Sequence, residues 1–97
     1  MLDITQTDAF TRWIAGLRDD KARAKIITRI ERLAMGNPGD VSPVGGGVSE
    51  LRIDYGPGYR VYFMRRSTTV ILVLCGGDKR MQAKDIRLAQ KMVSELE

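Results

Sequence analysis

The 97-residue sequence contains no histidine and a single cysteine, Cys75. One thiol cannot form an intramolecular disulfide. Without histidine, the chain cannot build a Ser-His-Asp triad or an ordinary zinc site of its own. Cys75 ends the apolar run of residues 70–75, which predicts a small buried hydrophobe rather than a nucleophile. We therefore expect no metal and no cofactor, and any catalysis must use other polar side chains.

Long apolar stretches are also missing. No segment approaches the ~20 apolar residues that a membrane-spanning helix needs, and residues 1–5 have neither the charged nor the apolar region of a signal peptide. We expect a cytoplasmic protein without membrane association, which agrees with the near absence of cysteine.

The length and the charge limit what kind of protein this is. With 97 residues, 43% of them hydrophobic, the chain can bury one core, and we expect a single domain over residues 1–97. Its 16 lysines and arginines against 12 acidic residues give a net charge of +4. This excess favours an acidic or polyanionic partner, and ribosomal RNA, mRNA, DNA and an acidic protein all remain open.

The N-terminal third predicts a short strand followed by a helical hairpin. Residues 1–5 favour an edge strand, and apolar residues then recur at helical spacing over 9–17. A second helix begins at Asp19 or Asp20 and ends at the Gly-Asn-Pro-Gly sequence of residues 36–39, because glycine terminates helices and proline cannot continue them. Its predicted apolar stripe consists of Ile26, Ile27, Ile30, Leu33 and Ala34.

The remainder predicts a small sheet and a last helix. Residues 40–47 end in three glycines and are expected to form a mobile loop. Strand signals follow over 48–54, 59–66 and 68–75, and their short connections imply an antiparallel meander. A C-terminal helix is expected over 83–96. The order β-α-α-β-β-β-α is that of an α+β fold, with a small antiparallel sheet, an N-terminal helical hairpin and a C-terminal helix.

Two motifs connect the chain to a known family. Residues 50–63 read Glu-Leu-Arg-Ile-Asp-Tyr-Gly-Pro-Gly-Tyr-Arg-Val-Tyr-Phe, and residues 75–80 read Cys-Gly-Gly-Asp-Lys-Arg. Together with Phe-Thr-Arg-Trp at 10–13, they resemble the HigB-like addiction module killer proteins of the RelE/ParE superfamily over nearly the whole chain. The resemblance implies a small antiparallel sheet with a helical hairpin packed against it, and a toxin of a type II toxin-antitoxin system.

The same resemblance implies an activity. RelE-like toxins grip mRNA in the ribosomal A site through basic residues on the concave face of the sheet and promote its cleavage. A ribosome-dependent endoribonuclease that inhibits translation is therefore expected. The chain has Glu50 and Asp54 where RelE has further lysines, and it has no counterpart of RelE's late aromatic acid/base or of HigB's late histidine. The matching basic residues are Arg52, Arg60, Lys79 and Arg80.

Cleavage of RNA by its own 2′-hydroxyl needs a base, a proton donor to the departing oxygen and cations for the charge of the phosphorane. Arginine can bind phosphate through two parallel hydrogen bonds but is a poor base. The base must then be a carboxylate such as Glu50 or Asp78, a lysine such as Lys79, or a group of the ribosome. Alternation places Arg60 and Tyr62 on one face, where Tyr62 is predicted to stack on a base. The alternative is that Tyr62 packs in the core and Arg60 is merely solvated.

A basic stripe runs along the second helix, opposite its apolar stripe. Such a stripe can hold phosphates of ribosomal RNA through contacts that weaken steeply with salt, although most charged helix faces are only solvated. Lys84, near the start of the last helix, belongs to the same predicted RNA-binding set. The stripe consists of Lys21, Lys25, Arg29 and Arg32.

Two other functions remain open. A ParE-like toxin binds DNA gyrase and traps its cleaved DNA, and the missing late acid/base keeps that alternative open. A regulatory module would only bind an antitoxin and co-repress transcription. In every case we expect a cognate antitoxin, of helix-turn-helix type as is common in HigB-like systems, through which operator DNA is reached. The nuclease hypothesis adds the ribosome and mRNA as partners.

Overall fold

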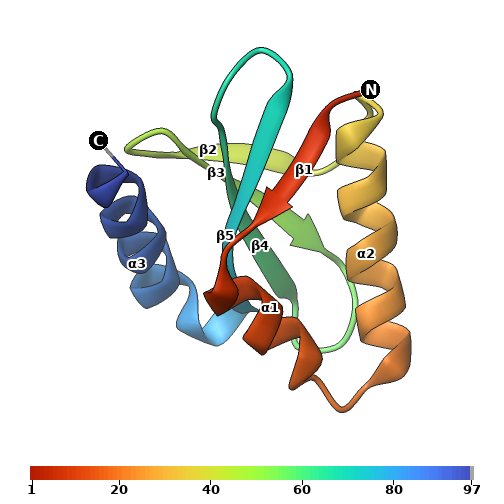
Figure 1. Cartoon of the computed structure of the whole chain (residues 1–97). Helices are drawn as coiled ribbons and strands as arrows, with labels where there is room; N and C mark the ends of the chain where they lie inside the picture. Colours follow the sequence, from red (N-terminus) through yellow and green to blue (C-terminus); the bar gives the residue numbers. More distant parts are fainter. Residues whose placement is uncertain (97) are drawn as a thin grey trace.

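A computed structural model describes residues 1–96 as one sheet with helices on both faces (Figure 1). The α+β class predicted from the sequence is confirmed. No helix in residues 1–96 has the length and apolarity needed to cross a membrane. In chain order the elements are β1 (Asp3–Gln6), α1 (Asp8–Ala15), α2 (Asp20–Ala34), β2 (Val41–Gly45), β3 (Val48–Ile53), β4 (Tyr59–Arg65), β5 (Val70–Asp78), the 3-10 turn η1 (Lys79–Met81) and α3 (Gln82–Glu95).

Side-chain caps begin the two N-terminal helices. The Thr7 hydroxyl accepts a hydrogen bond of 3.1 Å from the backbone N–H of Phe10. The Asp19 carboxylate accepts from the N–H groups of Lys21 and Ala22 at 3.0 and 3.1 Å. These bonds satisfy donors that the first turn of a helix leaves without an intrahelical partner. The hydrogen bond from the N–H of Ala22 is the main cause that lowers the pKa of Asp19, and a hydrogen bond from the Tyr55 hydroxyl lowers it further.

Within residues 1–96 the strands form a five-stranded sheet in the order β1-β5-β4-β3-β2. The antiparallel meander predicted for the later strands is confirmed, because β2, β3, β4 and β5 pair antiparallel in turn. β1 instead pairs with β5 in parallel, with Asp3 opposite Val70. Short turns set the direction of strands that follow one another in the chain, and they say nothing about two strands from opposite ends of it.

The prediction of a mobile loop at residues 40–47 is wrong. This segment forms strand β2 and a tight turn into β3, with Val41 paired to Leu51. Gly45, Gly46 and Gly47 have φ values of 93°, 64° and 80°. This left-handed region is open to glycine at little cost, so the three glycines shape a defined turn. The same backbone freedom that suggested mobility is used here to reverse the chain.

The sheet separates two cores, with α1 and α2 on one face and α3 on the other (Figure 1). Ile27, assigned to the apolar stripe of α2, lies outside both and is 48% exposed. The first core includes Phe10, Ile26, Ile30, Leu33, Leu51, Ile53, Val61, Phe63, Ile71 and Val73. The second includes Val48, Tyr62, Leu72, Leu74, Cys75, Ala89 and Val93.

A β-bulge interrupts the alternation of β5. Tyr62 pairs with Cys75 and Phe63 pairs with Val73, so Leu74 is the extra residue. Leu74 and Cys75 consequently both belong to the core beneath α3. Cys75 is 4% exposed. Burial raises the pKa of its thiol to about 12, so the predicted role of a buried hydrophobe is confirmed.

Candidate functional site

The register of β3 and β4 sets two arginines opposite each other. Arg52 pairs with Arg60, and directly paired residues of neighbouring strands point to the same side of a sheet. Both line a pocket of about 280 Å³ at the end of the sheet where η1 begins, and Lys79 of η1 joins them. The other residues that line the pocket are Asp40, Ile53, Asp54 and Gly58.

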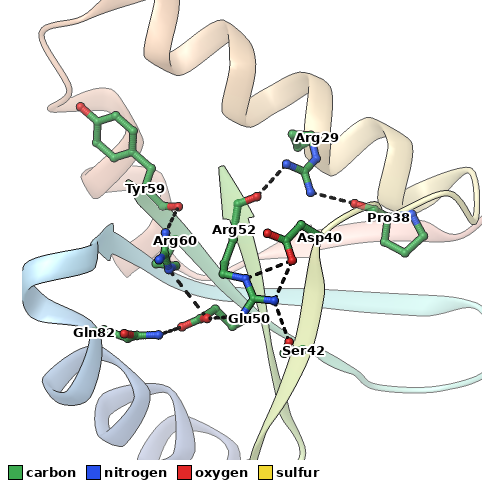
Figure 2. A network of polar contacts seen from close by, with 9 residues as sticks. All are labelled: Arg29, Pro38, Asp40, Ser42, Glu50, Arg52, Tyr59, Arg60 and Gln82. Carbon is green, nitrogen blue, oxygen red and sulfur yellow. Dashed lines mark hydrogen bonds and ion pairs between the residues drawn. The ribbon is translucent and has the colours of Figure 1, made fainter. Parts of the chain in front are cut away.

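Arg52 is held by oxygen atoms of three side chains (Figure 2). Its Nε and Nη2 donate to Oδ1 of Asp40 at 3.1 and 2.6 Å, and Nη2 also donates to Oγ of Ser42 at 2.8 Å. Its Nη1 lies 3.5 Å from Oε1 of Glu50. The hydrogen bond from Arg52 lowers the pKa of Asp40, and the same bond raises the pKa of Arg52. The guanidinium therefore stays charged in one orientation at the rim of the pocket.

Arg60 lies deeper, with a side chain that is 11% exposed. Its Nη1 donates to the carbonyl oxygens of Gly58 and Tyr59 at 3.0 and 3.3 Å. Its Nε lies 3.7 Å from Oε1 of Glu50 and has no hydrogen-bond partner within residues 1–96. Arg60 is thus a nearly buried cation whose carboxylate partner is in ion-pair range but beyond hydrogen-bond distance.

Glu50 lies beneath both arginines and is 1% exposed. Its Oε2 accepts a hydrogen bond of 2.7 Å from Nε2 of Gln82, at the start of α3 (Figure 2). A buried carboxylate between two guanidinium groups acts as their counter-ion and holds their orientation. This placement contradicts the prediction of Glu50 as a base, because a base must come within hydrogen-bond reach of the proton that it takes.

Tyr62 is fully buried under α3, at 0% exposed. Burial raises the pKa of its hydroxyl, which has no hydrogen-bond partner in the described chain. The predicted stacking on an RNA base is therefore wrong for this arrangement, because no base can reach the ring. The alternation correctly gave the face of β4 but could not show that α3 covers it.

Two basic residues, Lys79 and Arg80, follow β5, and of these Lys79 lines the pocket. A Cβ on Gly58 would lie only 3.3 Å from Cβ of Lys79, so this glycine lets the turn before β4 approach η1. The Arg80 side chain is 85% exposed, lies outside the pocket lining, and has Nη2 3.8 Å from Oδ2 of Asp78. Asp78 also caps η1, by accepting from the N–H of Met81 at 3.2 Å. Asp78 and Arg80, both predicted as catalytic, thus lie beside the pocket rather than in it.

The basic stripe of α2 borders a separate pocket of about 450 Å³. Nζ of Lys25 stands 5.3 Å from the ring centre of Tyr55. Arg29 donates to the carbonyl oxygens of Arg52 and Pro38 at 2.7 and 3.0 Å (Figure 2). Arg29 therefore has a structural role, because it anchors α2 to β3 and to the loop that follows α2. The exposed members of the predicted RNA-binding set are Lys21, Lys25, Arg32 and Lys84, the last of which lines neither pocket.

Three residues of the site escaped the sequence reasoning. Asp40 and Ser42 fell in the segment expected to be a loop, and Gln82 preceded the predicted C-terminal helix. Only the pairing of β2 with β3 brings Asp40 and Ser42 to Arg52. The one available signal was the glycine triplet at residues 45–47, which is compatible with a hairpin turn as well as with a loop.

Residues 12–94 match the family described as Phage derived protein Gp49-like (DUF891). The chain belongs to this Gp49-like family. An uncharacterized protein of Haemophilus influenzae Rd is 45% identical over 95 residues, which cover 98% of this chain and 96% of that relative. The Gp49-like family is a RelE/toxin-like family associated with toxin-antitoxin systems. The predicted toxin-antitoxin context is confirmed at this level, and family membership indicates a cognate antitoxin as a partner.

Proposed function

We propose that this Gp49-like protein is the toxin of a type II toxin-antitoxin pair and cleaves mRNA on the ribosome, as RelE and HigB-like toxins do. The pocket in which Arg52, Arg60 and Lys79 meet carries this proposal. Three cations around one small space suit a phosphodiester backbone, whose charge dominates the affinity of proteins for nucleic acids.

In this proposal the arginines stabilise the charge that grows on the phosphate during cleavage. Arg52 at the rim contacts a phosphate oxygen directly, and Arg60 adds charge from below. Glu50, fixed by Gln82, keeps both guanidinium groups in place before the substrate arrives. Donors held in position in this way need no rearrangement in the transition state, which is the basis of electrostatic catalysis.

Proton transfer has fewer candidates than the sequence alone suggested. Glu50 is buried and Asp78 caps η1. Lys79, which is exposed and lines the pocket, remains as a donor or acceptor from this chain. We propose that Lys79 works together with groups of the ribosome, which accounts for an activity that depends on the ribosome.

The remaining partners follow from the same proposal. The antitoxin is proposed to be a helix-turn-helix protein, through which the pair reaches operator DNA. The exposed cations of α2 form a second basic surface, which is proposed to contact ribosomal RNA phosphates through Lys21, Lys25 and Arg32. Lys84 of α3, on the other side of the sheet, is proposed as a separate RNA contact.

Primer extension on transcripts after induction of the wild-type protein tests the proposal. We expect new 5′ ends inside translated codons of a reporter mRNA, and none in a matched reporter whose start codon is mutated. Intact transcripts together with DNA-damage signalling would identify a gyrase poison instead. If overexpression of the protein does not impair growth, only the role of an antitoxin-binding module would remain.

A further inference from the structure

The carboxylate of Asp40 occupies an anion position in the pocket, at the Nε–Nη2 edge of Arg52. Oδ1 of Asp40 accepts from both Nε and Nη2 of Arg52, at 3.1 and 2.6 Å (Figure 2). A phosphate oxygen facing the same edge of the guanidinium would take these two bonds. The other carboxylate near Arg52, that of Glu50, lies 3.5 Å from Nη1 and therefore leaves this edge to Asp40.

The surroundings of Asp40 have the charge of an anion site. The hydrogen bond from Arg52 is the main cause that lowers the pKa of Asp40, and the charges of Arg52, Arg29 and Arg60 lower it further against the effect of burial. Asp54 lines the same pocket, yet within residues 1–96 it forms no ion pair. The two acidic residues that line the pocket thus differ in direct contact with Arg52.

The Asp40 side chain can leave Arg52 while its backbone stays in place. The backbone carbonyl of Asp40 accepts from the N–H of Arg52 at 3.0 Å, and Arg29 holds the carbonyl of Pro38 two residues earlier. The Asp40 side chain itself is 60% exposed. An exposed ion pair is weak because water competes for both partners, so a change of side-chain rotamer is enough to release Arg52.

We propose that the Asp40 carboxylate holds the place of the substrate phosphate, and that RNA enters the pocket by displacing Asp40 from Arg52. This inference rests on the proposed function, in which the pocket binds RNA phosphate. Asp40 then determines specificity. A small anion must compete with a carboxylate tethered beside Arg52, whereas an RNA strand held by other basic residues presents its phosphate at a high effective concentration.

The test compares two substitutions that remove the same charge from the same pocket. Inorganic phosphate is titrated into the intact protein at constant ionic strength, and NMR follows the Nε–Hε resonances of Arg52 and Arg60. Asp40→Asn should bind phosphate about tenfold more tightly than the wild type, since a neutral amide oxygen competes less well than a carboxylate for the donor pair of Arg52. Asp54→Asn should gain at most about threefold, because it changes only the screened field around the pocket. Asp40→Ser is a second way to remove the carboxylate, for use if the amide of Asn disturbs the fold, and it should show the same gain in phosphate affinity.

A third variant ties the gain to Arg52. In the background of Arg52→Gln, the effect of Asp40→Asn should fall to that of Asp54→Asn. Equal gains from Asp40→Asn and Asp54→Asn would overturn the inference, as would phosphate affinity no higher in Asp40→Asn than in the wild type. The titration involves neither ribosomes nor cleavage. If Asp40→Asn binds phosphate more tightly but the wild-type protein leaves mRNA intact, the proposed function is wrong. The role of Asp40 as a mimic of phosphate would still hold.

Discussion

Arginine side chains in this protein serve two different tasks. Arg29 holds the loop after α2 against β3, whereas Arg60 donates to the carbonyl oxygens of the two residues before it and still lines the pocket. Arg52 faces the pocket, and its close partners are the side chains of Asp40 and Ser42. A guanidinium that is already bound to carbonyls has fewer donors left for a phosphate, so the number of arginines overstates the capacity of the site.

The thiol of Cys75 should be unreactive in the native protein. Burial raises its pKa from 9.0 to about 12. At pH 8 its thiolate fraction is then about 1,000-fold below that of an unperturbed cysteine. Labelling with iodoacetamide, followed by mass spectrometry, should be slow in buffer and rapid in guanidinium chloride. The native rate should rise about tenfold per pH unit while the fold persists, since labelling requires the thiolate. Equal labelling rates in buffer and in denaturant would contradict the buried environment.

Alternation along a strand predicted which residues share a face but not what covers that face. Arg60 and Tyr62 do lie on the same side of β4, as the alternation required. Tyr62 and Glu50 were nevertheless misassigned, because the position of α3 over the sheet is a long-range contact that no local pattern encodes. Asp40, which pairs with Arg52, was missed because the pairing of β2 with β3 is likewise a contact that no local pattern encodes.

At the scale of elements, two helices pack closely against the end of β5. A Cβ on Gly76 would lie 2.4 Å from the ring of Trp13 in α1, and a Cβ on Gly77 would lie 1.9 Å from the carboxylate of Asp85 in α3. Glycine at position 76 is therefore a packing requirement, whereas a Cβ at position 77 would need the Asp85 carboxylate to move. Burial and the charge of Asp78 raise the pKa of Asp85.

Gly76→Ala should destabilise the protein because the Trp13 ring has no free space to accept a methyl group. We expect a free energy of unfolding lower by about 1–3 kcal/mol, measured by urea denaturation. Gly16→Ala is the matched control, since a Cβ there meets only ordinary contacts, at 3.4 Å or more. Trp13→Leu should reduce the effect of Gly76→Ala in a double-mutant cycle. A loss no larger than that of Gly16→Ala would argue against the close packing of α1 on β5.

Elements with a strong local signal were predicted well. The amphipathic spacing and the stop at residues 36–39 placed both N-terminal helices, and apolar runs placed β3, β4 and β5. β2 was missed because glycine favours a loop and a tight turn equally. The parallel direction of β1 depends on its pairing with the distant β5, about which its four residues carry no information.

For the whole molecule, basic side chains gather at two places that differ in construction. The exposed cations of α2 border an open surface, where contact with a polyanion is screened by salt. The pocket of Arg52, Arg60 and Lys79 is instead held by Glu50 from beneath and by Asp40 at its rim. In our account the exposed cations of α2 attract the protein to the ribosome, and the pocket stabilises the charge on the phosphate during cleavage.

The most direct test is the single-turnover rate of mRNA cleavage in a reconstituted ribosome complex, for Lys79→Ala against Arg80→Ala. Both residues are exposed neighbours in η1, and each substitution removes one cation, so general attraction to RNA is matched. Lys79→Ala should cut at least about tenfold more slowly, as expected for a lost charge-assisted contact, and Arg80→Ala should stay within about threefold of the wild type. Equal losses in the two variants, a larger loss in Arg80→Ala, or a wild-type protein that cuts no mRNA would contradict the pocket as the centre of activity.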